Sequence, residues 1–172
     1  MLQWVRSDVT VARLNGLVVK GLLHPLLAGQ EWIIPRGKPA PVLPAGYVIS
    51  FIDFCERRFT MPAHSFFRGL LHHNGVELQH LNPNGVKHIS AFIALCEGYL
   101  GVPPIFNLWR YFFSTSLIQT KINGVPTSHP VGCASIHLNS GSDCRSQQYI
   151  EMEMLKTSNK GCHASWCLLV LP

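Results

Sequence analysis

Charged side chains are scarce in this chain, where they make up 13% of 172 residues. A typical globular domain has about 25%. Acidic residues are the scarcer kind, with 9 Asp and Glu against 14 Lys and Arg, so the formal net charge is +5. The positive sign therefore reflects few acids rather than a dense basic patch. Attraction to nucleic acid is permitted but not required.

Long apolar runs are also missing. No window of about 18 residues is free of both charges and prolines, and the first ten residues lack the apolar core of a signal peptide. Hydrophobic residues nevertheless make up 47% of the chain, which is enough for a packed core. We therefore expect a soluble intracellular protein, in the nucleus or the cytoplasm, without contact to a membrane.

The six cysteines lack the spacing of a zinc site, because no Cys-x2-Cys pair occurs. Cys162 and Cys167 enclose His163, but a zinc knuckle needs a second close pair, and the nearest further cysteine is Cys144. Neither the phosphate-binding motifs GxxxxGK[ST] and GxGxxG nor the nucleophile motif GxSxG is present. We therefore expect no metal ion, no cofactor and no small-molecule substrate.

The strongest periodic pattern runs from Leu81 to Gly101. Asn82 can cap a helix here, Pro83 suits its first turn, and Gly101 can take the left-handed conformation that ends it. Apolar residues recur at spacings of three or four, which indicates an amphipathic helix that faces a core. These residues are Val86, Ile89, Ile93, Cys96 and Leu100, with Phe92 and Tyr99 widening the same stripe. We expect this helix to be the most buried long helix.

The N-terminal part predicts a helix over residues 9–20, capped by Ser7 or Asp8, and a short strand over 31–35. The proline-rich segment 36–46 is a stiff connector. The expected organisation is an N-terminal piece, 1–35, this connector, and a unit 47–172, which together form one structural unit. Half of a winged helix-turn-helix is an alternative for the N-terminal piece, although only one helix is evident.

The remaining segments predict an α+β fold. Residues 47–51 look extended, 52–59 and 62–74 look helical, and 105–117 form a further helix after Pro103 and Pro104. Short β-like segments follow at 134–138, 148–154 and 165–170. We expect a compact core of three to four helices with a small C-terminal antiparallel sheet packed against it.

Several motifs between Pro44 and Phe113 form a specific combination. They are Pro62-Ala63-His64, Phe67 with Leu70-Leu71, Leu81-Asn82-Pro83-Asn84-Gly85, Leu95-Cys96-Glu97, Gly101 with Pro104, and Trp109-Arg110-Tyr111-Phe112-Phe113. In this combination the chain closely resembles the gypsy-type transposon domain of plant proteins. The similarity continues on both sides of this run, over most of the chain.

The chain departs from the family at Cys162, where members usually carry a Trp, and at Cys167-Leu168, where they carry an aromatic pair. Members also run on into a long, often coiled-coil region, whereas this chain stops at Pro172. The resemblance thus implies either a transposon-derived frame that has lost its downstream part, or a head domain whose partner is its own tail.

The family name directs attention to carboxylates, because strand transfer needs acidic residues that hold two metal ions. Asp8, Asp53 and Asp143 lie in a helix cap, after a hydrophobic strand and in a Ser/Gly turn, respectively. A retroviral protease loop would need an aspartate where Asn139 precedes Ser140 and Gly141, and an amide cannot serve as the base. We therefore expect no enzymatic activity.

Two non-enzymatic functions remain. A gag-like structural or interaction domain would self-associate or bind a protein partner through exposed apolar surface, for which the aromatic-rich segment 106–113 is a candidate. A nucleic-acid-binding protein of the element would use cations around the helical core; the candidates are Arg57, Arg58, Arg68, His72, His73 and Lys87, with Arg110 and Lys121 behind them. We favour the interaction domain, because a dedicated DNA-binding protein of this length would carry more than 14 basic residues.

Overall fold

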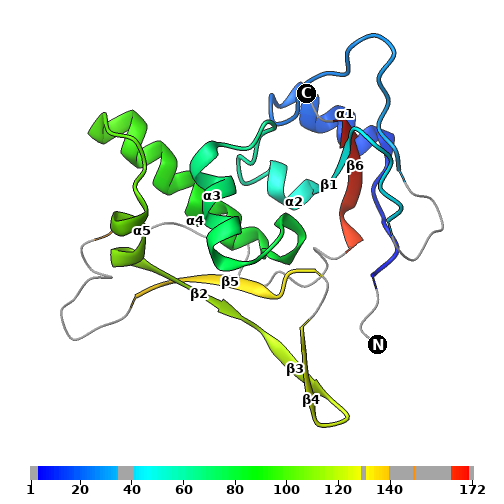
Figure 1. Cartoon of the computed structure of the whole chain (residues 1–172). Helices are drawn as coiled ribbons and strands as arrows, with labels where there is room; N and C mark the ends of the chain where they lie inside the picture. Colours follow the sequence, from blue (N-terminus) through cyan, green and yellow to red (C-terminus); the bar gives the residue numbers. More distant parts are fainter. Residues whose placement is uncertain (1–3, 35–40, 129–130, 140–148, 150–163, 171–172) are drawn as a thin grey trace.

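The computed structural model describes residues 4–34, 41–128, 131–139, 149 and 164–170. It contains a run of helices and short antiparallel strand pairs, which confirms the α+β class (Figure 1). The helices are α1 (Val11–Val19), α2 (Ile52–Cys55), α3 (Ser65–Asn74), α4 (Pro83–Ala94) and α5 (Phe106–Phe112), with a 3-10 turn, η1 (Leu78–His80), and a π-helical turn, η2 (Leu95–Leu100). The strands are β1 (Tyr47–Phe51), β2 (Phe113–Leu117), β3 (Gln119–Ile122), β4 (Val125–Ser128), β5 (Ala134–Leu138) and β6 (Trp166–Val170). Among the described helices, none combines the length and the apolar character that a membrane crossing requires.

Helix α4 is the expected central helix, and it begins as predicted. The side chain of Asn82 accepts a hydrogen bond from the backbone N–H of Gly85 at 2.7 Å, and Pro83 stands in the first turn. Ile89 and Phe92 are completely buried. They pack in the main core, which also contains side chains of α3, α5, β1, β2 and β5.

The apolar stripe of this helix does not stay buried to its end. Cys96 is buried as predicted, but Tyr99 and Leu100 are 87% and 55% exposed, which corrects the prediction for them. The reason is η2, whose wider π-helical turn changes the angle between successive side chains and rotates them off the buried face. Gly101 then ends the helix with φ +65°, and Figure 1 shows this end projecting at the left of the molecule.

The helix predicted for 105–117 ends earlier than expected, because the chain becomes extended at Phe113. From there β2 pairs antiparallel with β5, from Phe113 opposite Leu138 to Leu117 opposite Ala134. The run of Ser and Thr in β2 has little preference for a helix. The side chain of Asn139 donates hydrogen bonds to the carbonyls of Arg110 and Tyr111, at 3.0 and 3.1 Å, and so satisfies the last turn of α5.

The hairpin of β3 and β4 was not predicted. Its turn is Asn123-Gly124, with φ of +51° and +81° at the two residues. Positive φ at both central positions is the requirement of a type I′ turn, which Asn-Gly meets best. The dipeptide was therefore a local signal for this hairpin.

Antiparallel strands lie in the C-terminal part, roughly as predicted, but they form separate strand pairs rather than one sheet. Strand β6 pairs antiparallel with β1, from Tyr47 opposite Val170 to Phe51 opposite Trp166. Successive side chains of a strand point to opposite faces. Trp166 thereby enters the main core, whereas Cys167 and Leu169 enter a second core. Apart from Tyr149, the strand predicted over 148–154 lies outside the described residues.

The second core joins α1 to α2 and β6. Its buried members are Val9, Leu14, Leu17, Ile52, Cys55, Cys167 and Leu169. Helix α1 forms as predicted, although its N-cap is Thr10 rather than Ser7 or Asp8. The strand predicted over 31–35 is reduced to a single bridge between Ile33 and Leu168. Most of the connector, residues 35–40, lies outside the described part of the chain.

A histidine is buried in the main core. His88 of α4 is 6% exposed, its ring lies 5.3 Å from that of Phe113, and within the described residues its Nδ1 has no hydrogen-bond partner. Burial lowers the pKa of His88 from 6.5 to about 4, and the positive charges of His137 and Lys87 act in the same direction. The imidazole is therefore neutral at physiological pH.

Two isoleucines of α4 provide a matched test of the core. Ile89 is completely buried, whereas Ile93 is only partly buried at the edge of the same cluster. We expect Ile89→Ala to lower the free energy of unfolding by about 2 to 5 kcal/mol, because it leaves a cavity, and Ile93→Ala to lower it by clearly less. Denaturant unfolding measures both. Equal losses for the two variants would contradict the burial of α4 described above.

The pKa of His88 predicts a pH dependence of stability. Because the folded pKa lies below the unfolded value, the unfolded chain binds more protons between pH 6.5 and 4. The contribution of His88 to stability is complete above pH 6.5 and falls as pH drops toward 4, by at most about 1.4 kcal/mol per pH unit. Denaturant unfolding at several pH values should therefore show a flatter profile for His88→Gln. The exposed His72→Gln should keep the slope of the unmodified chain; an identical slope in both variants would refute the assignment.

Candidate interaction surfaces

Arg57, one of the predicted phosphate contacts, is not available to a ligand. It is 2% exposed, and its Nη1 lies 2.7 Å from the carbonyl oxygen of Asp53 and 3.5 Å from the Oδ1 of the same residue. The hydroxyl of Ser165 donates to the other carboxylate oxygen, Oδ2, at 2.5 Å. The prediction that Arg57 is an exposed cation is therefore wrong, because a buried carboxylate takes up its charge.

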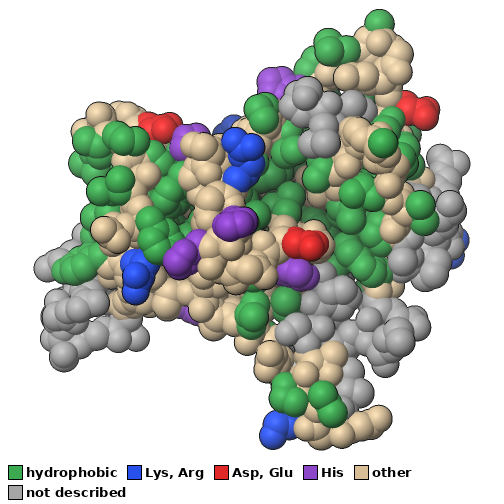
Figure 2. Space-filling view, in the orientation of Figure 1, with side chains coloured by type: hydrophobic (Ala, Val, Ile, Leu, Met, Phe, Trp, Pro, Cys, Tyr) green, Lys and Arg blue, Asp and Glu red, His purple; other side chains and the backbone are tan. Residues whose placement is uncertain are grey.

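The other predicted cations do not form one patch. Arg58 follows α2, Lys87 lies partly buried on α4, and only Arg68, His72 and His73 share a helix, α3. Figure 2 shows the Lys and Arg side chains of this face as separate spots, with His side chains between them. Such an arrangement gives no continuous track for a nucleic-acid backbone.

A large apolar groove lies beside the second core, with a cavity volume of about 620 Å³. Its walls come from the end of α1 and the segment after it, from α2, and from the residues that lead toward α3. The lining residues are Val18, Gly21, Leu22, Leu23, His24, Pro25, Leu26, Leu27, Gln30, Trp32, Cys55, Phe59, Thr60, Met61, Pro62 and Leu169. Most of them are apolar and none is acidic, so the groove suits apolar side chains rather than a charged ligand.

The outer wall of the groove is a structured turn. The backbone N–H of Leu27 donates to Gln30 Oε1 and the backbone N–H of Gln30 donates to the Leu27 carbonyl, both at 3.0 Å. Gly29 takes φ +83° between them. This turn holds Leu27 69% exposed at the groove, so the apolar wall is formed before a partner arrives.

The floor of the groove is chemically inert. Cys55 is 4% exposed, and burial raises the pKa of its thiol to about 11. The thiol is therefore protonated at neutral pH, which makes it a poor nucleophile. Cys167, in the same core, also has a raised pKa through burial. The other members of the cysteine pattern considered for zinc, Cys144 and Cys162, lie outside the described residues.

A second apolar surface, the tip, is formed where the chain leaves η2. Tyr99, Leu100, Val102 and Ile105 are 87%, 55%, 43% and 54% exposed. They follow one another closely in the chain, and Figure 2 shows hydrophobic side chains gathered at the same end of the molecule. Scattered exposed apolar residues are ordinary, but a contiguous group marks an interaction surface.

The tip is tied to α3 by a histidine. The Nδ1 of His64 accepts a hydrogen bond from the backbone N–H of Phe66 at 3.1 Å, so the ring proton is on Nε2. Nε2 lies 3.0 Å from a carboxylate oxygen of Glu97 in η2 and donates to it. One imidazole therefore both caps α3 and restrains η2.

Sequence reasoning missed both surfaces. The tip residues Tyr99 and Leu100 were assigned to a buried stripe, and the aromatic segment 106–113, proposed as apolar surface, keeps Trp109 and Phe113 in the main core. The Leu-rich run Leu22-Leu23 and Leu26-Leu27, interrupted only by His24 and Pro25, was the available signal for the groove. A turn after a helix is usually polar, so four leucines in this short segment indicate an apolar surface.

Comparison with known proteins gives one match. Residues 48–117 match a family described as “Putative gypsy type transposon”. No curated protein and no solved structure matches the chain. The matched segment runs from β1 to the end of β2 and contains the whole tip, but it excludes the groove residues from Val18 to Trp32. Over these residues the chain is similar to proteins of gypsy-type transposons, which confirms that part of the resemblance.

Proposed function

We propose that the chain is a non-catalytic, gag-like assembly domain of a transposon-derived protein, and that it associates with further copies of itself. The observation that carries this proposal is the pair of complementary apolar surfaces, a projecting tip and a concave groove. In each association step, the tip of one copy enters the groove of the next copy.

The positions of the two surfaces require two copies. The tip lies at the end of η2, at the left of Figure 1, whereas α1 and the segment after it lie at the upper right. A copy therefore cannot place its tip in its own groove. Covering Tyr99 and Leu100 on one side and Leu27 on the other removes apolar surface from water, which is favourable in proportion to the area buried.

The charges at the two surfaces support the same pairing. Glu97 lies in η2 beside the tip, and its side chain is 49% exposed. His24 lines the groove and Lys20 is the C-cap of α1, close to it in the chain, while none of the described lining residues is acidic. Tip and groove thus carry opposite charge tendencies, which favours this orientation over tip-to-tip contact.

Contact between two different surfaces is heterologous. Such contacts leave a free tip and a free groove at the ends of every oligomer, so they continue into rings or filaments. Extended assembly of this kind is what a structural domain needs and an isolated binding domain does not.

Two single substitutions test the geometry. Leu27→Glu places a charge in the groove, and Tyr99→Glu places one on the tip; both residues are largely exposed, so the fold should be retained. Sedimentation velocity over a range of concentrations should show growing oligomers for the unmodified chain and monomers for each variant alone. A mixture of the two variants should form a 1:1 dimer and nothing larger, because only one intact tip and one intact groove remain for contact.

Val42→Glu is the matched control, because Val42 is 69% exposed, as is Leu27, and does not line the groove. It should assemble like the unmodified chain. A chain that is monomeric at all concentrations, or variants that fail to complement each other, would exclude head-to-tail assembly. Dimers in either variant alone would indicate contact between like surfaces instead.

The proposed absence of catalysis has its own test. Asp53 is occupied by Arg57 and Ser165, Asp8 is more than half exposed near Arg13, and Asp143 lies outside the described residues. Labelled DNA incubated with the protein and Mg²⁺ or Mn²⁺ should remain intact. Cleavage that is lost in Asp53→Asn or Asp143→Asn would refute this part of the proposal.

A further inference from the structure

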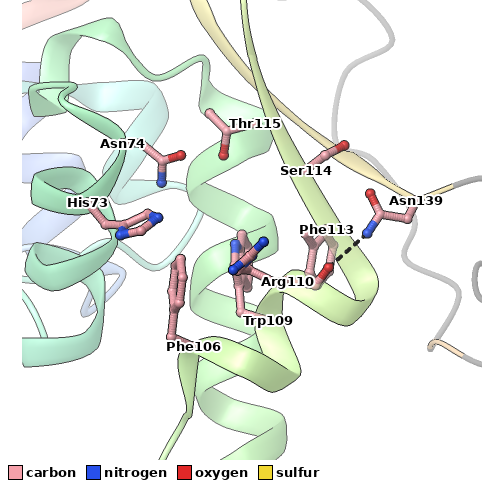
Figure 3. A pocket seen from close by; sticks show the side chains of 9 residues that line it. All are labelled: His73, Asn74, Phe106, Trp109, Arg110, Phe113, Ser114, Thr115 and Asn139. Atoms are coloured by element: carbon pink, nitrogen blue, oxygen red, sulfur yellow. Dashed lines mark hydrogen bonds between the residues drawn. The ribbon is translucent and has the colours of Figure 1, made fainter.

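A second concave site lies between α3, α5 and β2, away from the groove. Its cavity has a volume of about 260 Å³. Figure 3 shows the lining residues, which are His73, Asn74, Phe106, Trp109, Arg110, Phe113, Ser114, Thr115 and Asn139. None of these is acidic, whereas Arg110 is a permanent cation and His73 becomes one on protonation. The cavity therefore favours an anionic ligand.

Arg110 and His73 both lie against one aromatic ring, that of Phe106. The ring centroid of His73 lies 4.2 Å from that of Phe106, and the Cζ of Arg110 lies 5.8 Å from the same centroid. A guanidinium at this distance from an aromatic face is attracted to it. Phe106 thus brings Arg110 of α5 and His73 of α3 to the same site, although the two residues lie far apart in the chain.

Neutral donors complete the site. Figure 3 shows the side chains of His73 and Asn74 directed from α3 toward the space that Arg110 approaches from α5, with Thr115 on the β2 side. The amide nitrogens of Asn139 and Asn74 are engaged with backbone carbonyls, Asn139 at the end of α5 and Asn74 at Leu70, at 2.8 Å, so the hydroxyls of Ser114 and Thr115 are the main neutral donors. A planar guanidinium and several neutral donors around one small space suit the oxygen atoms of a phosphate group.

We propose that this cavity binds one nucleotide of single-stranded nucleic acid, with the phosphate at Arg110 and His73. The volume is too small for a long ligand but sufficient for one nucleotide unit. A single strand can place one nucleotide inside a recessed site. The phosphates of a duplex are instead bound by cations on an open surface. This binding is independent of the proposed head-to-tail assembly.

The test measures binding of the full chain to a labelled single-stranded oligonucleotide at several salt concentrations. We expect Arg110→Gln to weaken binding about tenfold and to reduce the slope of log affinity against log salt by about 0.7, the value for one contact to a single strand. His73→Gln should weaken binding less. Arg58→Gln, which removes an exposed arginine outside the cavity, should leave affinity close to that of the unmodified chain.

Three results of the binding measurement itself would overturn the proposal, and a fourth comes from competition. The first three are an equal loss of affinity in Arg58→Gln and Arg110→Gln, duplex binding as tight as that of the single strand, and no measurable binding at all. Thymidine monophosphate and inorganic phosphate serve as competitors that distinguish the source of the phosphate. If either one displaces the oligonucleotide at concentrations similar to that of the oligonucleotide itself, the cavity is a site for a free anion, and the single-strand assignment is wrong. Circular dichroism of each variant shows whether the fold is retained.

Discussion

The pairing of β6 with β1 is the interaction on which the rest of this structure depends. Because both faces of β6 are buried, one short strand carries Trp166 into the main core and Leu169 into the second core. The N-terminal segment is attached to the same strand, through a 2.7 Å hydrogen bond from Trp166 Nε1 to the carbonyl of Val5. Loss of this strand would remove Trp166 from the main core and Cys167 and Leu169 from the second core, so the strand links the stability of the two.

The positions of the three candidate surfaces, which are the tip, the groove and the small cavity, follow from how the helices pack around the β1–β6 pair and its two cores. The buried face of helix α4 packs in the main core, and the segment that continues from this helix beyond the core, η2 and the residues after it, forms the tip. The groove forms because α1 contacts α2 and β6 while the segment after it turns away. The small cavity forms where α5 ends early and β2 begins. Only the tip lies wholly in the segment matched by the transposon family, whereas the groove combines residues inside that segment, such as Cys55 and Phe59, with residues before and after it.

Local chemistry made part of this structure predictable. Asn82, Pro83 and Gly101 act within a few residues of their own positions, and the structure confirms all three. The exposure of Tyr99 was not predictable from spacing, because a π-helical turn breaks the period on which the prediction depends. Arg57 was misassigned for a different reason: the Asp53 carboxylate that holds it is itself bound by Ser165, which is 112 residues further along the chain. A contact between residues so far apart in the chain cannot be predicted from the local sequence around either residue.

The position of β6 late in the chain has a consequence for synthesis. Proteins emerge from the ribosome N-terminus first, and a domain folds only when its contacting segments are available. Here α1 and β1 must wait for residues 166–170, so their apolar faces stay uncovered until this strand has been synthesised. A nascent chain in this state is a natural substrate for chaperones, and premature termination before β6 would release a product that aggregates rather than one that folds.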